Sequence, residues 1–268
     1  MPENVTTLAE GKLRLDTPAP NVARLTIANP AKRNALDHPI LDAIAATLAG
    51  LEARCVIVTG SDGMFSAGYD IGEISEDEFQ ERAEPLIAHP FAAAIEALED
   101  YPYPTLAALT GPTIGGGLEL ALACDLRIAA DGISLGMPPA RLGLVYSHTG
   151  LRRFVDAIGV PRTRELFLLG RYIDAETAAL WGLVNRVWAS EELEAASIGL
   201  AVELAGHAPL AQRGNKRVIR ALLDAEAALD PEVEAELLAL RIASFASRDM
   251  REGLRAFSEK RPPRWEGR

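Results

Sequence analysis

The chain has 268 residues, of which 49% are hydrophobic, so it is long enough to bury the core of one large α/β domain. Its 27 basic and 38 acidic residues give a net charge of −11, which opposes binding to phosphate backbones and to anionic membranes. We therefore expect neither a nucleic-acid partner nor a membrane partner.

The first predicted elements are a hairpin and a helix. Strand patterns at 13–15 and 22–28 flank the turn-forming segment 17–21, which contains two prolines. A helix is predicted over 38–51, and Asp37 stands directly before it as an N-cap.

A strand, a helix and a second strand follow. The apolar runs at 55–59 and 104–109 are typical of strands buried on both faces, and the segment 85–99 between them has helical periodicity. A right-handed crossover would bring the loops after Thr59 and Thr110 to the same edge of a parallel sheet. Ligands bind at that edge in α/β proteins.

The rest of the chain divides into strands and then helices. Short strands are predicted at 126–129, 133–135 and 183–187, and the remainder is helical in pattern with broad apolar faces that need a partner. We therefore expect an α/β core over residues 1–190 and a helical region over residues 191–268 that packs across a subunit interface.

Cysteine usage and the amino terminus favour a cytoplasmic protein. Cys55 and Cys124 both lie in apolar runs, which is typical of buried free thiols in a reducing compartment. The first six residues lack the basic and apolar regions of a signal peptide. No apolar run approaches membrane-spanning length.

The most informative stretch is GPTIGGGLE at 111–119, which ends an apolar strand and opens a helix with Glu119 in its first turn. The first N–H groups of a helix lack intrahelical partners and carry partial positive charge, so they can hold an anion against glycines that have no Cβ. The loop FSAGYD at 65–70 follows another strand and would supply a second donor. Two such donors would stabilise the oxyanion of an acyl group. Taken alone, a glycine triplet more often marks a helix packed closely on a sheet.

Several familiar motifs are missing. Leu120 stands where a dinucleotide-binding Gly-x-Gly-x-x-Gly needs its third glycine, and Gly117 stands where a P-loop needs its lysine. The chain has no Gly-x-Ser-x-Gly elbow, and its four histidines lack metal-ligand spacing. We therefore expect no resident metal or nucleotide cofactor, and a protease of Ser-His-Asp type is remote.

Six segments together resemble a known family, and they span essentially the whole chain. They are NPAKRNAL at 29–36, FSAGYDI at 65–71, GGGLELA at 115–121, CD at 124–125, ALWGLVN at 179–185, and the ending from Glu252 through Phe257 to the KRP at 260–262. In this order they are similar to the enoyl-CoA hydratase/isomerase (crotonase) superfamily.

That resemblance implies an acyl-CoA substrate, a spiral core of ββα turns, and a C-terminal helical region that builds a trimer or a dimer of trimers. It assigns the backbone N–H groups of Tyr69 and Gly116 to the oxyanion hole. Coenzyme A is part of the substrate, so no separate cofactor is implied. The CoA-binding residues it implies are Lys32, Arg33, Ala67, Asp70 and Ile71, with Phe257 and Lys260 contributed by a neighbouring subunit.

The choice of reaction depends on the carboxylates. Glu119 matches one glutamate of the family hydratases, but the position of the second one falls on Pro139. Addition of water benefits from two carboxylates and is therefore handicapped. A reaction with one carboxylate is favoured, either a double-bond shift with Glu119 as base or loss of CO2 from a malonyl-type thioester.

Two further segments favour decarboxylation. LGLVY at 142–146 and RAFSEKR at 255–261 resemble the methylmalonyl-CoA decarboxylases more than the hydratases. That resemblance implies that Glu119 and Tyr146 face the acyl group, with the Tyr146 hydroxyl holding the departing carboxylate out of the thioester plane. His148 is either an additional acid/base or a loop residue. Isomerase or hydratase activity is the runner-up, and a non-catalytic CoA-binding scaffold is a second alternative.

Overall fold

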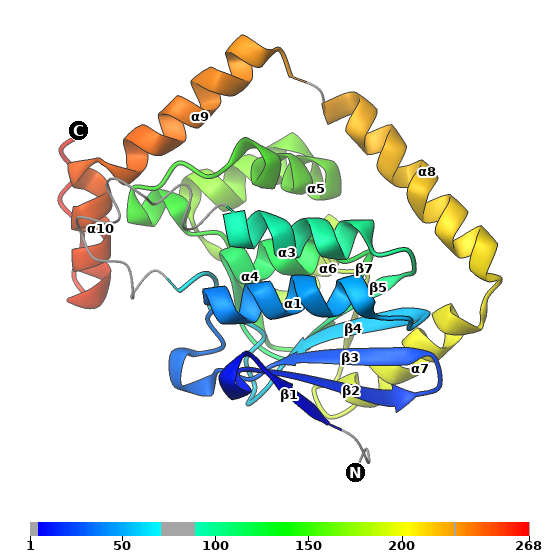
Figure 1. Cartoon of the computed structure of the whole chain (residues 1–268). Helices are drawn as coiled ribbons and strands as arrows, with labels where there is room; N and C mark the ends of the chain where they lie inside the picture. The colour runs from blue at the N-terminus through cyan, green and yellow to red at the C-terminus, as the bar shows by residue number, and fades with distance from the viewer. Residues whose placement is uncertain (1–4, 71–88, 228, 268) are drawn as a thin grey trace.

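The centre of the fold is a seven-stranded sheet with strand order β1-β2-β3-β4-β5-β7-β10 (Figure 1). The computed structural model describes residues 5–70, 89–227 and 229–267. The first three strands pair antiparallel and the others pair parallel. The strands are Thr6–Leu8 (β1), Leu13–Ala19 (β2), Val22–Ile27 (β3), Cys55–Gly60 (β4), Thr105–Leu109 (β5), Leu126–Ala130 (β7) and Arg186–Trp188 (β10).

A second, three-stranded sheet with the order β6-β8-β9 leads into the site. β6 pairs parallel with β8, and β8 pairs antiparallel with β9. The very short β6 runs directly into the glycine triplet, so its pairing fixes where the next helix begins. The strands are Thr113–Ile114 (β6), Ser134–Gly136 (β8) and Tyr172–Asp174 (β9).

Helices cover both faces of the large sheet. α1 and α3 contact each other over one face, whereas α7 packs across strands β2 to β5 and β7 on the other (Figure 1). The helices are His38–Gly50 (α1), His89–Asp100 (α3), Gly116–Leu122 (α4), His148–Leu169 (α5), Ala175–Trp181 (α6), Leu193–Gly206 (α7), Pro209–Ala227 (α8), Pro231–Phe245 (α9) and Arg248–Ser258 (α10), with 3-10 turns at Pro30–Lys32 (η2) and Pro139–Leu142 (η4).

The predicted strand–helix–strand unit with parallel strands is confirmed. Every residue of β4 and β5 is buried, and the two strands pair in parallel with α3 between them in the chain. The hairpin is β2 with β3, and α1 begins at His38 with the Asp37 carboxylate accepting the N–H of Ile40 at 3.1 Å. The first residues of the helix predicted over 85–99 lie outside the described residues.

Three strands, β1, β6 and β9, were not predicted, and one is displaced. β1 and β9 are three residues each and pair at sheet edges, where short patterns carry little signal. The strand predicted over 183–187 begins at Arg186 because the N–H groups of Leu183 and Val184 both donate to the carbonyl of Ala178, at 2.9 and 3.2 Å. Those two bonds close the turn after α6, so these two apolar residues are buried without joining the ladder.

The C-terminal helices divide into a core helix and outlying ones. Leu193, Ala201 and Ala205 of α7 belong to the main hydrophobic core. α8 and α9 extend away from the sheet, and α10 returns to pack on η4 (Figure 1). A domain boundary at residue 190 stays a prediction. The large apolar side chains exposed on α8 and α9 are Leu210, Val218, Ile219, Leu222, Leu223, Val233, Leu238, Leu240 and Ile242.

The two thiols are buried and unoxidised. Cys55 and Cys124 are free cysteines, and burial raises the pKa of each to about 12. Such thiols are neutral and unreactive at neutral pH. Within the described ranges, no helix has the length and apolar composition that crossing a membrane requires.

The capping carboxylate of α1 provides a test of this part of the fold. Asp37 is buried, accepts the N–H of Ile40 and forms an ion pair with Lys12 at 2.7 Å. We expect Asp37→Ala to lower the free energy of unfolding by about 1–2 kcal/mol, measured by urea denaturation. Asp42→Ala, at an exposed position of the same helix, should change it by less than about 0.5 kcal/mol. Equal losses in both variants would contradict the capping role.

Candidate active site

The site begins with the loop over residues 65–70, which lies between two other backbone segments. On one side, the N–H of Leu36 donates to the Gly68 carbonyl at 2.8 Å, and the N–H of Asp70 donates to the Leu36 carbonyl at 2.9 Å. On the other side, the N–H of Ile114 donates to the Ser66 carbonyl at 2.9 Å. The loop is therefore held by main-chain bonds against β6, directly before α4.

This arrangement directs the Tyr69 amide toward the start of α4. Gly68 and Asp70 both bond Leu36, and N–H groups alternate in direction along extended backbone, so the N–H of Tyr69 points away from that segment. A Cβ placed on Gly116 would lie only 3.3 Å from the Tyr69 nitrogen. In the described part of the chain, no backbone carbonyl accepts the N–H of Gly116. The two amides predicted as oxyanion donors are thus adjacent.

Glycine is required at different positions of the triplet for different physical reasons. Gly115 has φ 57° and ψ −126°, a conformation open essentially to glycine alone. A Cβ on Gly117 would lie 2.6 Å from the Ser66 Cβ, so only glycine lets α4 approach the 65–70 loop this closely. The close-packing interpretation of the triplet is confirmed, and this packing brings the Gly116 amide beside that of Tyr69, while the oxyanion role of the two amides stays a prediction.

Glu119 lies in the first turn of α4 and is only 3% exposed. The Tyr146 hydroxyl donates to its Oε2, and Arg153 Nη1 donates to its Oε1 at 3.2 Å. Gly150 leaves space for this group, because a Cβ there would lie 2.8 Å from Glu119 Oε1 and 2.6 Å from Tyr146 Cε1. The two residues predicted as catalytic are therefore joined directly by a hydrogen bond.

The surroundings of this pair favour the neutral forms of both groups. Burial raises the pKa of Glu119, although Arg153 and the Tyr146 hydroxyl oppose the rise. Burial and the adjacent Glu119 raise the pKa of Tyr146 well above its usual value. Tyr146 therefore remains a hydrogen-bond donor, while Glu119 is able to hold or release a proton closer to neutrality than an exposed carboxylate does.

Sequence reasoning missed the second carboxylate near this pair. Pro139 is buried in η4, and Glu99 of α3 is linked to Glu119 through one guanidinium. Arg153 Nε and Nη2 donate to the Glu99 carboxylate at 2.6 and 3.0 Å. The sequence analysis gave Arg153 no role, because nothing in the chain spacing relates Glu99 to Arg153.

Four of the predicted CoA-binding residues lie together. Lys32 Nζ forms an ion pair with Asp70 at 2.7 Å, and the N–H of Ala67 donates to the Arg33 carbonyl at 3.0 Å. Arg33 is exposed. Ile71 lies outside the described residues. The roles of all five in binding stay predictions.

The other predicted residues lie on the C-terminal side of the fold. Phe257 is 70% exposed on α10, and Lys260 is exposed just beyond it, while α10 itself packs on η4. Their contribution to a neighbouring subunit stays a prediction. His148 Nε2 lies 3.6 Å from Glu234 Oε1 of α9, so in this structure His148 joins α5 to α9.

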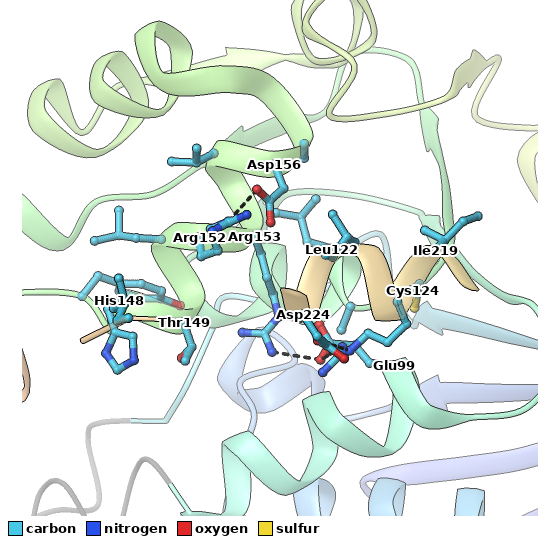
Figure 2. Close-up of a pocket in the computed structure, with 18 of the residues that line it drawn as sticks. Glu99, Leu122, Cys124, His148, Thr149, Arg152, Arg153, Asp156, Ile219 and Asp224 are labelled. Carbon is cyan, nitrogen blue, oxygen red and sulfur yellow. Dashed lines mark hydrogen bonds and ion pairs between the residues drawn. The ribbon is translucent and has the colours of Figure 1, made fainter. Parts of the chain in front are cut away.

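A cavity of about 980 Å³ lies behind the Glu119–Tyr146 pair, between α4 and α5 on one side and α8 and α9 on the other. Glu99, Tyr146 and Arg153 are among the residues that line it, and Figure 2 shows Arg153 and Glu99 close together at its inner wall. The outer wall carries aliphatic side chains such as Ile219 of α8. Residues 72–85, which the sequence analysis expected along the acyl pocket, lie outside the described residues.

Comparison with known proteins agrees with the predicted family. The family model described as enoyl-CoA hydratase/isomerase matches residues 18–268. The human mitochondrial enoyl-CoA hydratase domain-containing protein 2 is 34% identical, covering 94% of this chain and 87% of its own length. The mouse mitochondrial methylglutaconyl-CoA hydratase is 32% identical, covering 88% of this chain and 76% of its own length.

Solved structures resemble the fold along most of the chain. A methylmalonyl-CoA decarboxylase complexed with 2S-carboxypropyl CoA has a TM-score of 0.88 and 28% identity, covering 96% of this chain and 98% of the other. An enoyl-CoA hydratase/isomerase from Pseudoalteromonas atlantica has a TM-score of 0.81 and 28% identity, covering 95% of this chain and 100% of the other.

The close approach of the two amide-bearing segments is testable at Gly68. Its φ is +99°, and a Cβ there would lie 2.9 Å from the Ile114 carbonyl oxygen and 3.1 Å from the Gly116 nitrogen. We expect Gly68→Ala to lower the free energy of unfolding by at least about 2 kcal/mol more than Gly132→Ala does. Gly132 is the matched control, since its φ is +66° and its added Cβ meets nothing within 4 Å. Equal losses in urea denaturation would mean that the two segments are not tightly packed.

Proposed function

The chain belongs to the enoyl-CoA hydratase/isomerase (crotonase) family, and from this premise we propose that it releases CO2 from a malonyl-CoA or methylmalonyl-CoA type of thioester. The observation that carries the proposal is the Glu119–Tyr146 pair, a single buried carboxylate bonded to a neutral hydroxyl where the hydratases use two carboxylates. The fold likeness to a methylmalonyl-CoA decarboxylase supports the same choice.

In the proposed reaction, the thioester oxygen accepts hydrogen bonds from the amides of Tyr69 and Gly116. When the bond between the α-carbon and the carboxylate breaks, its electron pair enters the thioester to form an enolate, and CO2 leaves. The developing charge rests on the oxygen, which the two fixed amides stabilise without rearranging. A proton then adds to the α-carbon of the enolate and gives the product thioester.

Glu119 and Tyr146 handle that proton. While Glu119 is ionised, the Tyr146 hydroxyl donates to it and has no proton left for the substrate. When Glu119 is protonated, it donates to the Tyr146 oxygen instead, and the Tyr146 proton turns toward the substrate carboxylate. The pair then supplies the proton that the enolate takes. Burial favours this acid form by raising the pKa of Glu119.

Isomerisation is the second candidate, and one observation favours it. Arg153 at 3.2 Å stabilises the carboxylate form of Glu119, which a proton-shuttling base requires. Hydration is less well supported, because Glu99 does not replace the missing acid. Burial tends to raise the pKa of Glu99, but Arg153 and Arg220 outweigh burial and hold it below its usual value.

We also propose that the active form is a cytoplasmic homotrimer or dimer of trimers. The exposed apolar rows of α8 and α9 need a cover, and a second copy of the chain is the occupant that the family resemblance implies. In that assembly Lys32 and Arg33 would meet the CoA phosphates, and Phe257 and Lys260 would reach the adenine end from a neighbour. The site needs no resident cofactor.

The direct test is to incubate the purified protein separately with methylmalonyl-CoA and crotonyl-CoA. We expect CO2 and propionyl-CoA from the first. Glu119→Gln and Tyr146→Phe should each lower kcat by about 10²-fold or more while CoA-ester binding is retained, since proton transfer contributes about 10²–10⁴-fold. Hydration of crotonyl-CoA without CO2 release would overturn decarboxylation. CoA-ester binding without turnover of either substrate would indicate a scaffold.

The pH dependence separates the two roles of Glu119. A proton donor is active below its pKa, so decarboxylation should lose kcat/KM as pH rises through the pKa of Glu119. Because burial raises this pKa, the decline should lie above the usual range of a glutamate. An isomerase that uses Glu119 as base should instead gain kcat/KM over the same interval. A decarboxylase profile that rises there would contradict the donor role.

A further inference from the structure

The guanidinium of Arg153 binds two carboxylates, the buried one of Glu119 and the half-buried one of Glu99. Arg153 of α5 donates two hydrogen bonds to Glu99, at 2.6 and 3.0 Å, but only one to Glu119, at 3.2 Å. Their carboxylate side chains are 13% and 4% exposed, so water competes little for either. Figure 2 shows Arg153 extending from α5 toward Glu99 at the inner wall of the cavity.

Glu99 is in turn held by the C-terminal region. Arg220 of α8 forms an ion pair with Glu99 Oε2 at 2.5 Å, and its Nε pairs with Asp224 one turn later at 2.9 Å. Two guanidiniums therefore meet on Glu99, which keeps it ionised and fixed in place. A fixed anion at this point holds Arg153 away from a second bond to Glu119.

We propose that Arg153 is a positioning residue that holds Glu119 Oε1 through one hydrogen bond. Glu99 competes with Glu119 for the same guanidinium and so limits how strongly Arg153 binds Glu119. This inference rests on the proposed function, in which Glu119 exchanges a proton. An arginine that paired both Glu119 oxygens would keep that carboxylate ionised. Because Arg153 is shared with Glu99, it orients the Glu119 carboxyl through one bond and still allows this carboxyl to be protonated.

The charged groups facing Glu119 come from several elements, and their signs agree with this account. Arg153 from α5 and Arg241 from α9 favour the carboxylate, and Glu99 from α3 opposes it. Tyr146, before α5, is a neutral donor to Oε2. The balance therefore depends on Arg153, whose guanidinium contacts both carboxylates directly.

The test compares Arg153→Met, Glu99→Gln and Arg152→Met in the full-length protein. Arg152 is the matched control, because it directly precedes Arg153 on α5 but forms its ion pair with Asp156, at 2.7 Å. The readout is the infrared band of the protonated Glu119 carboxyl as a function of pH, identified by its loss in Glu119→Gln. This signal exists whether or not the protein is active, so it is independent of the proposed reaction.

We expect the titration of Glu119 to move in opposite directions in the two variants. Arg153→Met removes a cation, so its midpoint should rise by about 1 pH unit. Glu99→Gln removes an anion and releases Arg153 toward Glu119, so its midpoint should fall. Arg152→Met should leave it unchanged. Arg153→Lys, which retains the charge but not the fork, should restore part of the wild-type value.

A merely structural role would give a different result. Equal midpoints in the Arg153→Met and Arg152→Met proteins, or shifts of the same sign in Arg153→Met and Glu99→Gln, would overturn the inference. If Arg153→Met does not fold, the direction of the Glu99→Gln shift still decides. Where CO2 release is observed, its decline with pH should move with the infrared midpoint; absence of release with the expected midpoints would reject only the proposed reaction.

Discussion

The candidate active site depends on the close approach of two backbone segments, the loop over residues 66–69 and the start of α4 at 114–117. Main-chain bonds fix the loop from both sides, and the absence of a side chain at Gly68 and Gly117 allows the contact. An enolate requires donors that are already in place when charge develops, because rearranging them would cost the energy that they supply. In the proposed site, main-chain packing provides that rigidity.

The same approach buries Glu119. Since α4 begins at the contact and Glu119 lies in its first turn, the carboxylate faces Tyr146 and Arg153 with little access to water. Its charge is thus set by a few neighbours and not by solvent. One of these neighbours, Arg153, forms an ion pair with Glu99, which also pairs with Arg220 of α8. The outlying helix α8 is therefore electrostatically connected to the candidate catalytic group.

Local patterns predicted the parts of this structure that local physics decides. The apolar runs of β4 and β5, the Asp37 cap and the glycine triplet each express a constraint that one segment contains, and the crossover follows from chain topology. The family resemblance then implied roles for Glu119 and Tyr146, and the structure shows a direct hydrogen bond between them.

The rest required three-dimensional contacts. Glu99 lies 54 residues from Arg153, and nothing in the amphipathic pattern of α8 distinguishes Arg220 from its other charged residues, so no spacing relates these three residues. The pairing of His148 with Glu234 of α9 could not be predicted either, because no sequence spacing relates the two residues. The start of β10 was misplaced because two buried apolar residues resemble a strand when their turn bonds to Ala178 are unknown.

The central claim is that the Tyr69 and Gly116 amides hold one thioester oxygen, and a crystal structure with an unreactive acyl-CoA thioester tests it most directly. The account predicts that this oxygen lies about 2.7–3.1 Å from both nitrogens, with the α-carbon facing Glu119 and Tyr146. A bound thioester whose oxygen contacts neither amide, or only one, would contradict it.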